Sequence, residues 1–160
     1  MRNDSSQKGF SIIEILIATM IISVVTLMVV LSIQIYTGMS RKTASNIQTA
    51  ILFEEAGEVL QLFRDKGWNS NIATLNLNTD YYIYWDGTNY SATSTQVITA
   101  GNYERTFSLS EIERDGNDTI ATSGTVDTNS LLVSIKVEWI NKGELESKST
   151  QMLIHNAYEN

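Results

Sequence analysis

Side chains that could form a catalytic or metal-binding set are sparse in this chain. It contains no cysteine, which excludes a disulfide framework, a thiolate metal site and a cysteine nucleophile. The single histidine, His155, lies in a strand-like run, where we expect a partly exposed structural role. The serine, threonine and carboxylate residues fall mostly in turns and on solvated helix faces, without a recognisable catalytic spacing. We therefore predict that the protein is not an enzyme and uses no cofactor.

One short acidic turn has a composition that suits a hard cation. It reads Asp115-Gly116-Asn117-Asp118. A calcium loop of the EF-hand type needs a glycine at its sixth position and a glutamate at its twelfth, and this stretch has neither. We therefore predict no metal site.

A more informative carboxylate lies beside a long apolar run. Glu14 is the only acidic or basic residue between Lys8 and Arg41, and residues 15–36 are almost entirely apolar. As a helix, that run would be about 33 Å long, which is enough to cross a hydrocarbon core of about 30 Å. A carboxylate one turn inside such a helix is costly unless it has a partner, so Glu14 is expected to have a function.

Two simpler interpretations of the apolar run are an ordinary membrane anchor and a secretory signal peptide with Arg2 and Lys8 at its positive end. The apolar part of a signal peptide is roughly 7–15 residues long and ends at a small-x-small site, which this run does not. An ordinary anchor leaves Glu14 unexplained. A retained helix with a specific role for Glu14 is therefore favoured.

The residues that precede Glu14 supply that role. The stretch Lys8-Gly9-Phe10-Ser11-Ile12-Ile13-Glu14 resembles the prepilin peptidase motif of type IV pilin-like proteins, in which a polar leader ends in Gly, Phe usually follows, and Glu stands four residues later. The resemblance implies cleavage between Gly9 and Phe10 on the cytoplasmic side and N-methylation of Phe10. It also implies that the apolar helix is retained and that Glu14 serves filament assembly, by pairing with the new amino group of a neighbouring subunit.

The helix that carries this motif is expected to continue beyond the apolar run. Residues 41–66 keep an apolar spacing near 3.6 and become amphipathic, and Lys66-Gly67 is a C-terminal signal. The expected buried stripe comprises Ile47, Ile51 or Leu52, Ala56, Val59 or Leu60, and Phe63. A loop is expected at residues 68–71.

Residues 72–156 have the pattern of an antiparallel sheet. Strands are predicted at 81–85, 88–90, 103–112, 133–139 and 145–154, with a hairpin turn at Asp86-Gly87. Residues 122–124 and 127–129 are polar and predict a mobile loop. The strand aromatics are expected to pack in a core rather than to form a ligand platform.

Together these features predict an α+β fold of the pilin type. A long N-terminal helix, with an apolar transmembrane half and an amphipathic half, packs on a small antiparallel β-sheet. The expected organisation is a leader at 1–9, an apolar transmembrane and filament-core helix at 10–40, and a globular head at 41–160 that contains the amphipathic helix 41–66 and the sheet 72–156.

The expected function is that of a structural subunit. The head also resembles minor pilins and pseudopilins in Phe63–Trp68, around Trp85 and in Val137-Glu138-Trp139, and the chain lacks the cysteine pair and kinking proline of many major pilins. This favours a minor pilin or pseudopilin of a type IV pilus or type II secretion-like filament. The alternative is a single-pass, membrane-anchored extracytoplasmic binding module, in which neither Gly9-Phe10 nor Glu14 would be required.

The same resemblance implies the partners and the location. The partners would be a prepilin peptidase/methyltransferase, other pilin subunits, an inner-membrane assembly platform and membrane lipid. The protein would be a single-pass inner-membrane protein before assembly and part of a cell-surface filament afterwards. A formal net charge of -7 and the lack of any Lys/Arg run argue against direct binding of nucleic acid.

Overall fold

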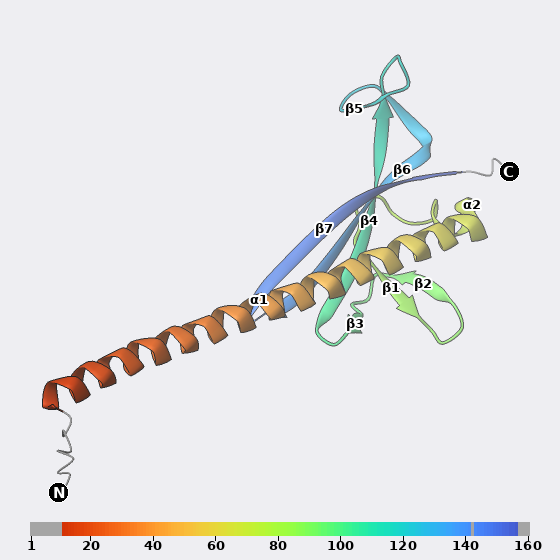
Figure 1. Ribbon diagram of the computed structural model, residues 1–160. Coiled ribbons are helices and arrows are strands. Elements are labelled where there is room, and N and C mark those ends of the chain that lie inside the picture. Colours follow the sequence, from red (N-terminus) through yellow and green to blue (C-terminus); the bar gives the residue numbers. More distant parts are fainter. Residues whose placement is uncertain (1–10, 142, 157–160) are drawn as a thin grey trace, which may run out of the picture. The chain divides into compact units, whose positions relative to one another are not determined.

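The computed structural model describes residues 11–141 and 143–156 (Figure 1). The chain divides into two units, Met1–Asn46 and Ile47–Asn160. Helix α1 (Ile12–Lys66) contains residues of both units and is 55 residues long. No proline interrupts this helix, because the chain contains none. The predicted continuation of the helix beyond the apolar run is confirmed.

The second unit contains the rest of α1, a one-turn helix and an antiparallel sheet. These further elements are α2 (Trp68–Asn71), β1 (Tyr81–Trp85), β2 (Tyr90–Thr93), β3 (Ile98–Ala100), β4 (Tyr103–Arg114), β5 (Ile120–Ala121), β6 (Thr125–Asn141) and β7 (Glu144–His155). The strand order is β2-β1-β4-β6-β7, and β3 and β5 each pair with β4. The predicted α+β fold is therefore confirmed.

The centre of the sheet is the long ladder between β4 and β6. It runs from Tyr103 opposite Trp139 to Arg114 opposite Thr125, with a bulge between Glu111 and Glu113. The next ladder, between β6 and β7, is continuous over twelve residue pairs. The predicted hairpin of β1 and β2 is present as well, because Trp85 lies opposite Tyr90 across the turn at Asp86-Gly87.

The core lies between α1 and one face of this sheet. From Val133 to Trp139 every second residue of β6 is buried against the helix, as the alternation predicted. On α1 the buried residues lie on one face at helical spacing, and they are Thr49, Leu52, Ala56, Val59, Leu60 and Phe63. Ile47 and Ile51 are 57% and 51% exposed, so Leu52 is the member of its predicted pair that packs, and the expected burial of Ile47 is wrong.

Two expected loops are regular structure instead. Residues 68–71 form α2, because the side chain of Trp68 is buried in the core and draws the chain into a turn in which the N–H of Ile72 donates to the carbonyl of Trp68. Residues 127–129 lie within β6. The carboxylate of Asp127 is fixed there by Arg114 of β4, so this polar stretch continues the strand.

The aromatic strand residues divide between core and surface. Tyr81 and Trp139 are buried, in line with the expected core role. Trp85 and Tyr84 are 50% and 44% exposed, so the core interpretation does not extend to the end of β1.

Candidate functional site

Glu14 lies in the first turn of α1. The backbone N–H groups of Glu14 and Ile15 donate to the carbonyl oxygen of Ser11 at 3.0 and 3.2 Å, which closes the start of the helix. A carboxylate in this position interacts favourably with the positive end of the helix dipole. The side chain of Glu14 is exposed, and between residues 11 and 40 of the described chain it is the single acidic or basic group.

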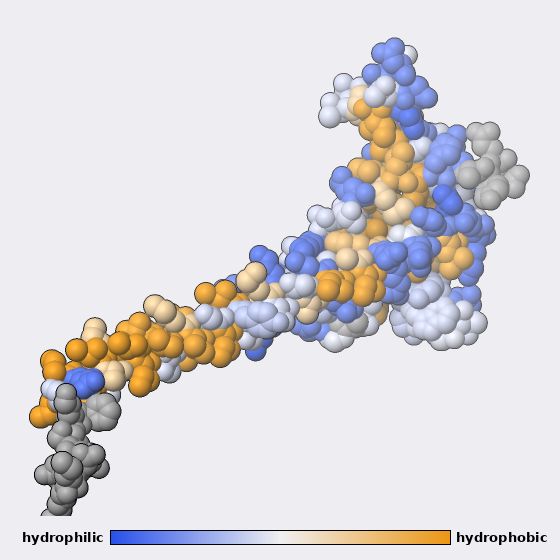
Figure 2. Space-filling view, viewed as in Figure 1, coloured by the Kyte–Doolittle hydropathy of each residue, from blue (hydrophilic) through white to orange (hydrophobic). Residues whose placement is uncertain are grey.

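The part of α1 that follows Glu14 is an apolar surface that none of the described residues covers. All residues from Ile12 to Arg41 are exposed, and aliphatic side chains make up most of the face of this stretch that Figure 2 shows. By length and composition, this stretch of α1 can cross a membrane. An apolar surface of this extent needs either lipid or other protein to cover it.

Most serine and threonine hydroxyl groups within this stretch bond to the helix itself. Five of them donate a hydrogen bond to a carbonyl three or four residues earlier, at 2.8–3.0 Å, and the donors are Thr19, Ser23, Thr26, Ser32 and Thr37. A buried hydroxyl without a partner is costly in an apolar medium. The helix therefore carries these five polar side chains with their hydroxyl donors paired.

Glu14 is the predicted site residue whose position the structure gives. Gly9 and Phe10, the predicted cleavage and methylation residues, lie outside the described residues. The relation of Glu14 to them therefore remains a prediction from the sequence.

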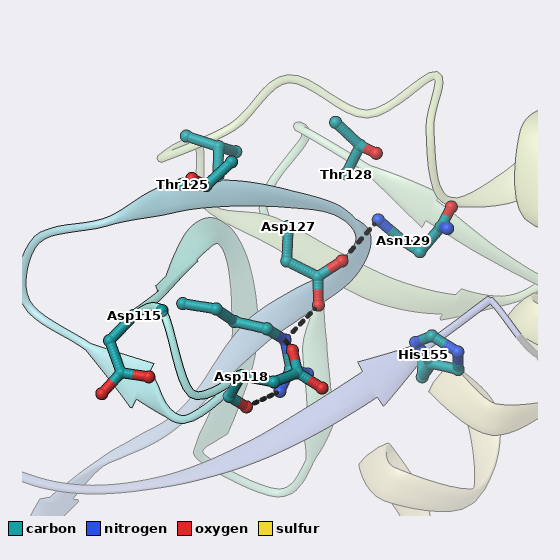
Figure 3. Close-up of a pocket in the computed structure, with 10 residues that line it drawn as sticks. Asp115, Asp118, Thr125, Asp127, Thr128, Asn129 and His155 are labelled. Atoms are coloured by element: carbon teal, nitrogen blue, oxygen red, sulfur yellow. Dashed lines mark hydrogen bonds and ion pairs between the residues drawn. The ribbon is translucent and has the colours of Figure 1, made fainter.

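A second candidate site is a hollow of about 510 Å³ beside the β4–β5–β6 arm of the head (Figure 3). Arg114 Nε lies 2.7 Å from Asp127 Oδ2, and Arg114 Nη1 donates to the carbonyl of Asp118 at 2.9 Å. The hydrogen bond from Arg114 is the main reason that the pKa of Asp127 falls from 3.8 to about 2. The pKa of Arg114 is raised for the same reason. The two central charges of the hollow thus neutralise each other.

The single histidine, His155, lines this hollow and is hydrogen-bonded to a buried serine. Ser130 Oγ and His155 Nδ1 are 2.9 Å apart, and Ser130 also hydrogen-bonds to Asp127. Because a carboxylate only accepts, Ser130 is the donor in its bond to Asp127. In a catalytic triad the imidazole lies between carboxylate and hydroxyl, whereas here the hydroxyl is central and fully buried. This arrangement joins β6 to β7 and has the geometry of a structural link.

The acidic turn at the same hollow uses its carboxylate internally. Asp115 Oδ1 accepts from the backbone N–H groups of Asn117 and Thr119 at 2.8 and 3.0 Å. These bonds, that from Thr119 foremost, lower the pKa of Asp115. In residues 11–141 and 143–156, no group of three His, Cys, Asp or Glu side chains is arranged to hold a metal ion.

The sequence interpretation missed one buried ion pair. Arg105 of β4 is 1% exposed, and its Nη1 lies 3.0 Å from Glu55 Oε2 on α1. A signal was present, since Arg105 occupies a position that alternates with the apolar residues Phe107 and Leu109 and must therefore face the helix.

Comparison with known proteins identifies the N-terminal segment. Residues 4–32 match the family model described as the prokaryotic N-terminal methylation motif. This match, together with the long helix on an antiparallel sheet, indicates a type IV pilin-like prepilin. Neither a curated protein nor a solved structure gave a match.

Proposed function

We propose that the protein is a structural subunit, a minor pilin or pseudopilin, of a type IV pilus or type II secretion-like filament. The observation that carries this proposal is the position of Glu14, one carboxylate at the start of an apolar helix that matches the methylation motif. The surface of that helix, exposed in the single chain, would be covered by lipid before assembly and by neighbouring helices afterwards.

The proposed processing follows from the same motif. A prepilin peptidase/methyltransferase removes residues 1–9 on the cytoplasmic side and methylates the new amino group of Phe10. Residues 10–40 then form the membrane-spanning and filament-core segment, and residues 41–160 form the head. The chain itself performs no catalysis in this scheme.

Glu14 would act through a charge that processing creates. An apolar environment disfavours its carboxylate unless a cation is near, and the freed amino group of Phe10 is such a cation. Pairing Glu14 of one subunit with Phe10 of its neighbour removes an unpaired charge from the apolar interior and sets the axial register of the incoming subunit. Other pilin subunits and an inner-membrane assembly platform are the expected partners, and the filament carries the head to the cell surface.

The deciding experiment measures incorporation of Glu14 variants into filaments in the native host. We expect Glu14→Ala and Glu14→Gln to be inserted, cleaved and folded normally but to be strongly depleted from sheared filaments. Glu14→Asp is expected to be partly defective because its shorter side chain reaches less far. Glu54→Ala is the matched control, since that glutamate is exposed on the same helix.

The contrary result would be incorporation of Glu14→Ala at the wild-type level. Glu14 would then have no assembly role, and the membrane-anchored binding module would become the better interpretation of the chain.

A further inference from the structure

The sequence contains three sites of the form Asn-x-Ser/Thr, which is the acceptor motif for N-linked glycosylation. Their asparagines are Asn3, Asn89 and Asn117. Such a motif can be modified only where it lies on an accessible surface of the extracytoplasmic part of a protein. Asn3 lies outside the described residues and in the leader that processing would remove. The structure therefore has two sites to distinguish, Asn89 and Asn117.

Asn117 lies in the turn between β4 and β5. All five residues from Asp115 to Thr119 are exposed, and the side chains of Asp115 and Asp118 are labelled in Figure 3. The turn is held by its own backbone. The N–H of Asp118 donates to the carbonyl of Asp115 at 3.1 Å, and the N–H of Asp115 donates to the carbonyl of Thr119 at 2.9 Å. None of these five residues belongs to the hydrophobic core.

The carboxylate of Asp115 orders this turn without occupying the groups that define the motif. Asp115 Oδ1 accepts from the backbone N–H groups of Asn117 and Thr119, so neither bond uses the Asn117 carboxamide or the Thr119 hydroxyl. Between them, Asp118 has a φ of 62°, in the left-handed region. The motif is therefore presented on a bent backbone, with both of its side chains exposed.

The motif at Asn89 is built into the sheet instead. Tyr90 and Ser91 belong to β2 and pair with β1. The ring of Tyr90 packs against Trp85 with centroids 4.7 Å apart, and Asn89 Oδ1 accepts from Lys66 Nζ at 3.2 Å. The nitrogen of an amide is a weak nucleophile because its lone pair is delocalised, so a transferase has to enclose the carboxamide and activate it. An exposed turn can enter such an enzyme, whereas a paired strand must first be detached.

We propose that Asn117 is glycosylated on the extracytoplasmic side of the membrane. The catalyst is a membrane oligosaccharyltransferase, and the donor is an oligosaccharide linked to a polyprenyl diphosphate. Asn117 Nδ2 forms a bond to the anomeric carbon of the first sugar and loses a proton, while the bond from that carbon to the diphosphate oxygen breaks and the lipid diphosphate leaves. The proposal rests on the extracytoplasmic head of the function proposed above. A bulky, hydrated glycan at this turn would keep it outside subunit contacts.

The test is glycopeptide mapping of the full chain purified from its native host. Trypsin cuts after lysine and arginine, and it therefore places Asn89 on peptide 67–105 and Asn117 on peptide 115–136. We expect a glycan mass on peptide 115–136, localised to Asn117 by fragmentation that keeps the sugar attached, and an unmodified peptide 67–105. Neither peptide contains Phe10, so processing of the N-terminus does not change their masses.

Variants of the motif show whether the glycan depends on it. Asn117→Gln removes the acceptor and Thr119→Val removes the hydroxyl, and we expect each to abolish the glycan. Thr119→Ser keeps the hydroxyl and should keep the glycan. Thr122→Val is the matched control, because it makes the same change at an exposed residue of the same peptide outside the motif. Since the changed side chains are exposed, near-UV circular dichroism of the full chain in detergent should be unchanged in all four variants.

Three results would overturn the proposal: an unmodified peptide 115–136 in the wild-type chain, a sugar that persists in Asn117→Gln, or a glycan at Asn89 with equal or higher occupancy. Glu14→Ala is measured in parallel. Glycosylation needs only a head that has crossed the membrane, so this variant should keep the glycan although it is depleted from filaments. Normal incorporation of Glu14→Ala would contradict the proposed filament function, whereas its depletion together with any of the three results would contradict the Asn117 proposal alone.

Discussion

The carboxylate of Glu55 and the guanidinium of Arg105 join α1 to β4 across the core of the head, with Oε2 and Nη1 3.0 Å apart. The side chain of Arg105 is 1% exposed and that of Glu55 is 37% exposed, so the pair extends from the interior to the surface. Arg105 Nη1 also donates to the carbonyl of Leu52 at 3.2 Å, and the hydroxyl of Tyr90 donates to Glu55 at 3.3 Å. These bonds fix the rotation of residues 47–66 on the sheet.

Glu55→Ala should therefore destabilise the head. It leaves the Arg105 guanidinium buried without its counter-ion, which typically costs roughly 3–5 kcal/mol, and we expect about 2–3 kcal/mol here because Glu55 is partly exposed. Urea unfolding of the full chain in detergent measures the change. Glu54→Ala, at an exposed neighbouring position, should stay within about 0.5 kcal/mol of wild type. Equal losses in the two variants would contradict a specific role for the ion pair.

The Arg114–Asp127 pair should make stability depend on pH in the acid range. The pKa of Asp127 is depressed in the folded state, from 3.8 to about 2, so its contribution is complete above the unfolded pKa and is lost as the pH falls toward 2. Asp127→Asn should lower the thermal midpoint at pH 5, and the gap to wild type should close between pH 4 and pH 2. Asp80→Asn is the control. A gap that stays constant down to pH 2 would show that ionisation of Asp127 contributes nothing.

Processing predicts a specific mass for the mature protein. Intact-mass measurement of the chain from native membranes should show loss of residues 1–9 and addition of one methyl group. Expression in a host whose prepilin peptidase has been inactivated should leave the full-length mass, because the apolar helix lacks a signal-peptidase site. A mature N-terminus beyond residue 36 would mean that the apolar run is an ordinary signal peptide.

Removal of the apolar segment should release a soluble head. A fragment that begins at Arg41 keeps the buried face of α1 and loses the apolar surface that needs lipid or other subunits. We expect a monomer by sedimentation that unfolds cooperatively, and equally so in reductant because the chain has no cysteine. Aggregation, or the absence of near-UV circular dichroism, would place the boundary of the head elsewhere.

Much of the fold could be predicted from periodicity, because one period dominates each element. The apolar residues of β6 alternate from Val133 to Trp139, and those of α1 beyond residue 47 recur at helical spacing. The bend at Trp68 could not be predicted in this way, because it depends on burial of one indole against the distant sheet. The extension of β6 through Asp127 depends on Arg114, which lies in another strand.

The candidate sites differ in the same way, since some are formed by neighbouring residues and others by residues far apart in the sequence. The motif from Lys8 to Glu14 is local in sequence, so reading it requires no fold. Glu55 and Arg105 are fifty positions apart, and only the packing of the helix on the sheet brings them together. The motifs at Asn89 and Asn117 are local as well, but only the fold shows that the first continues into β2 and that the second lies in an exposed turn.

The self-bonded hydroxyls of α1 bear on how reversible assembly can be. A helix whose serine and threonine donors bond to its own carbonyls keeps those bonds in lipid and in a protein bundle alike. For a filament subunit, extraction from the membrane and return to it would then exchange few hydrogen bonds. The direction of transfer would be left to side-chain packing and to the charge of Glu14, so a modest input of work at the filament base could drive growth or retraction with the same helix.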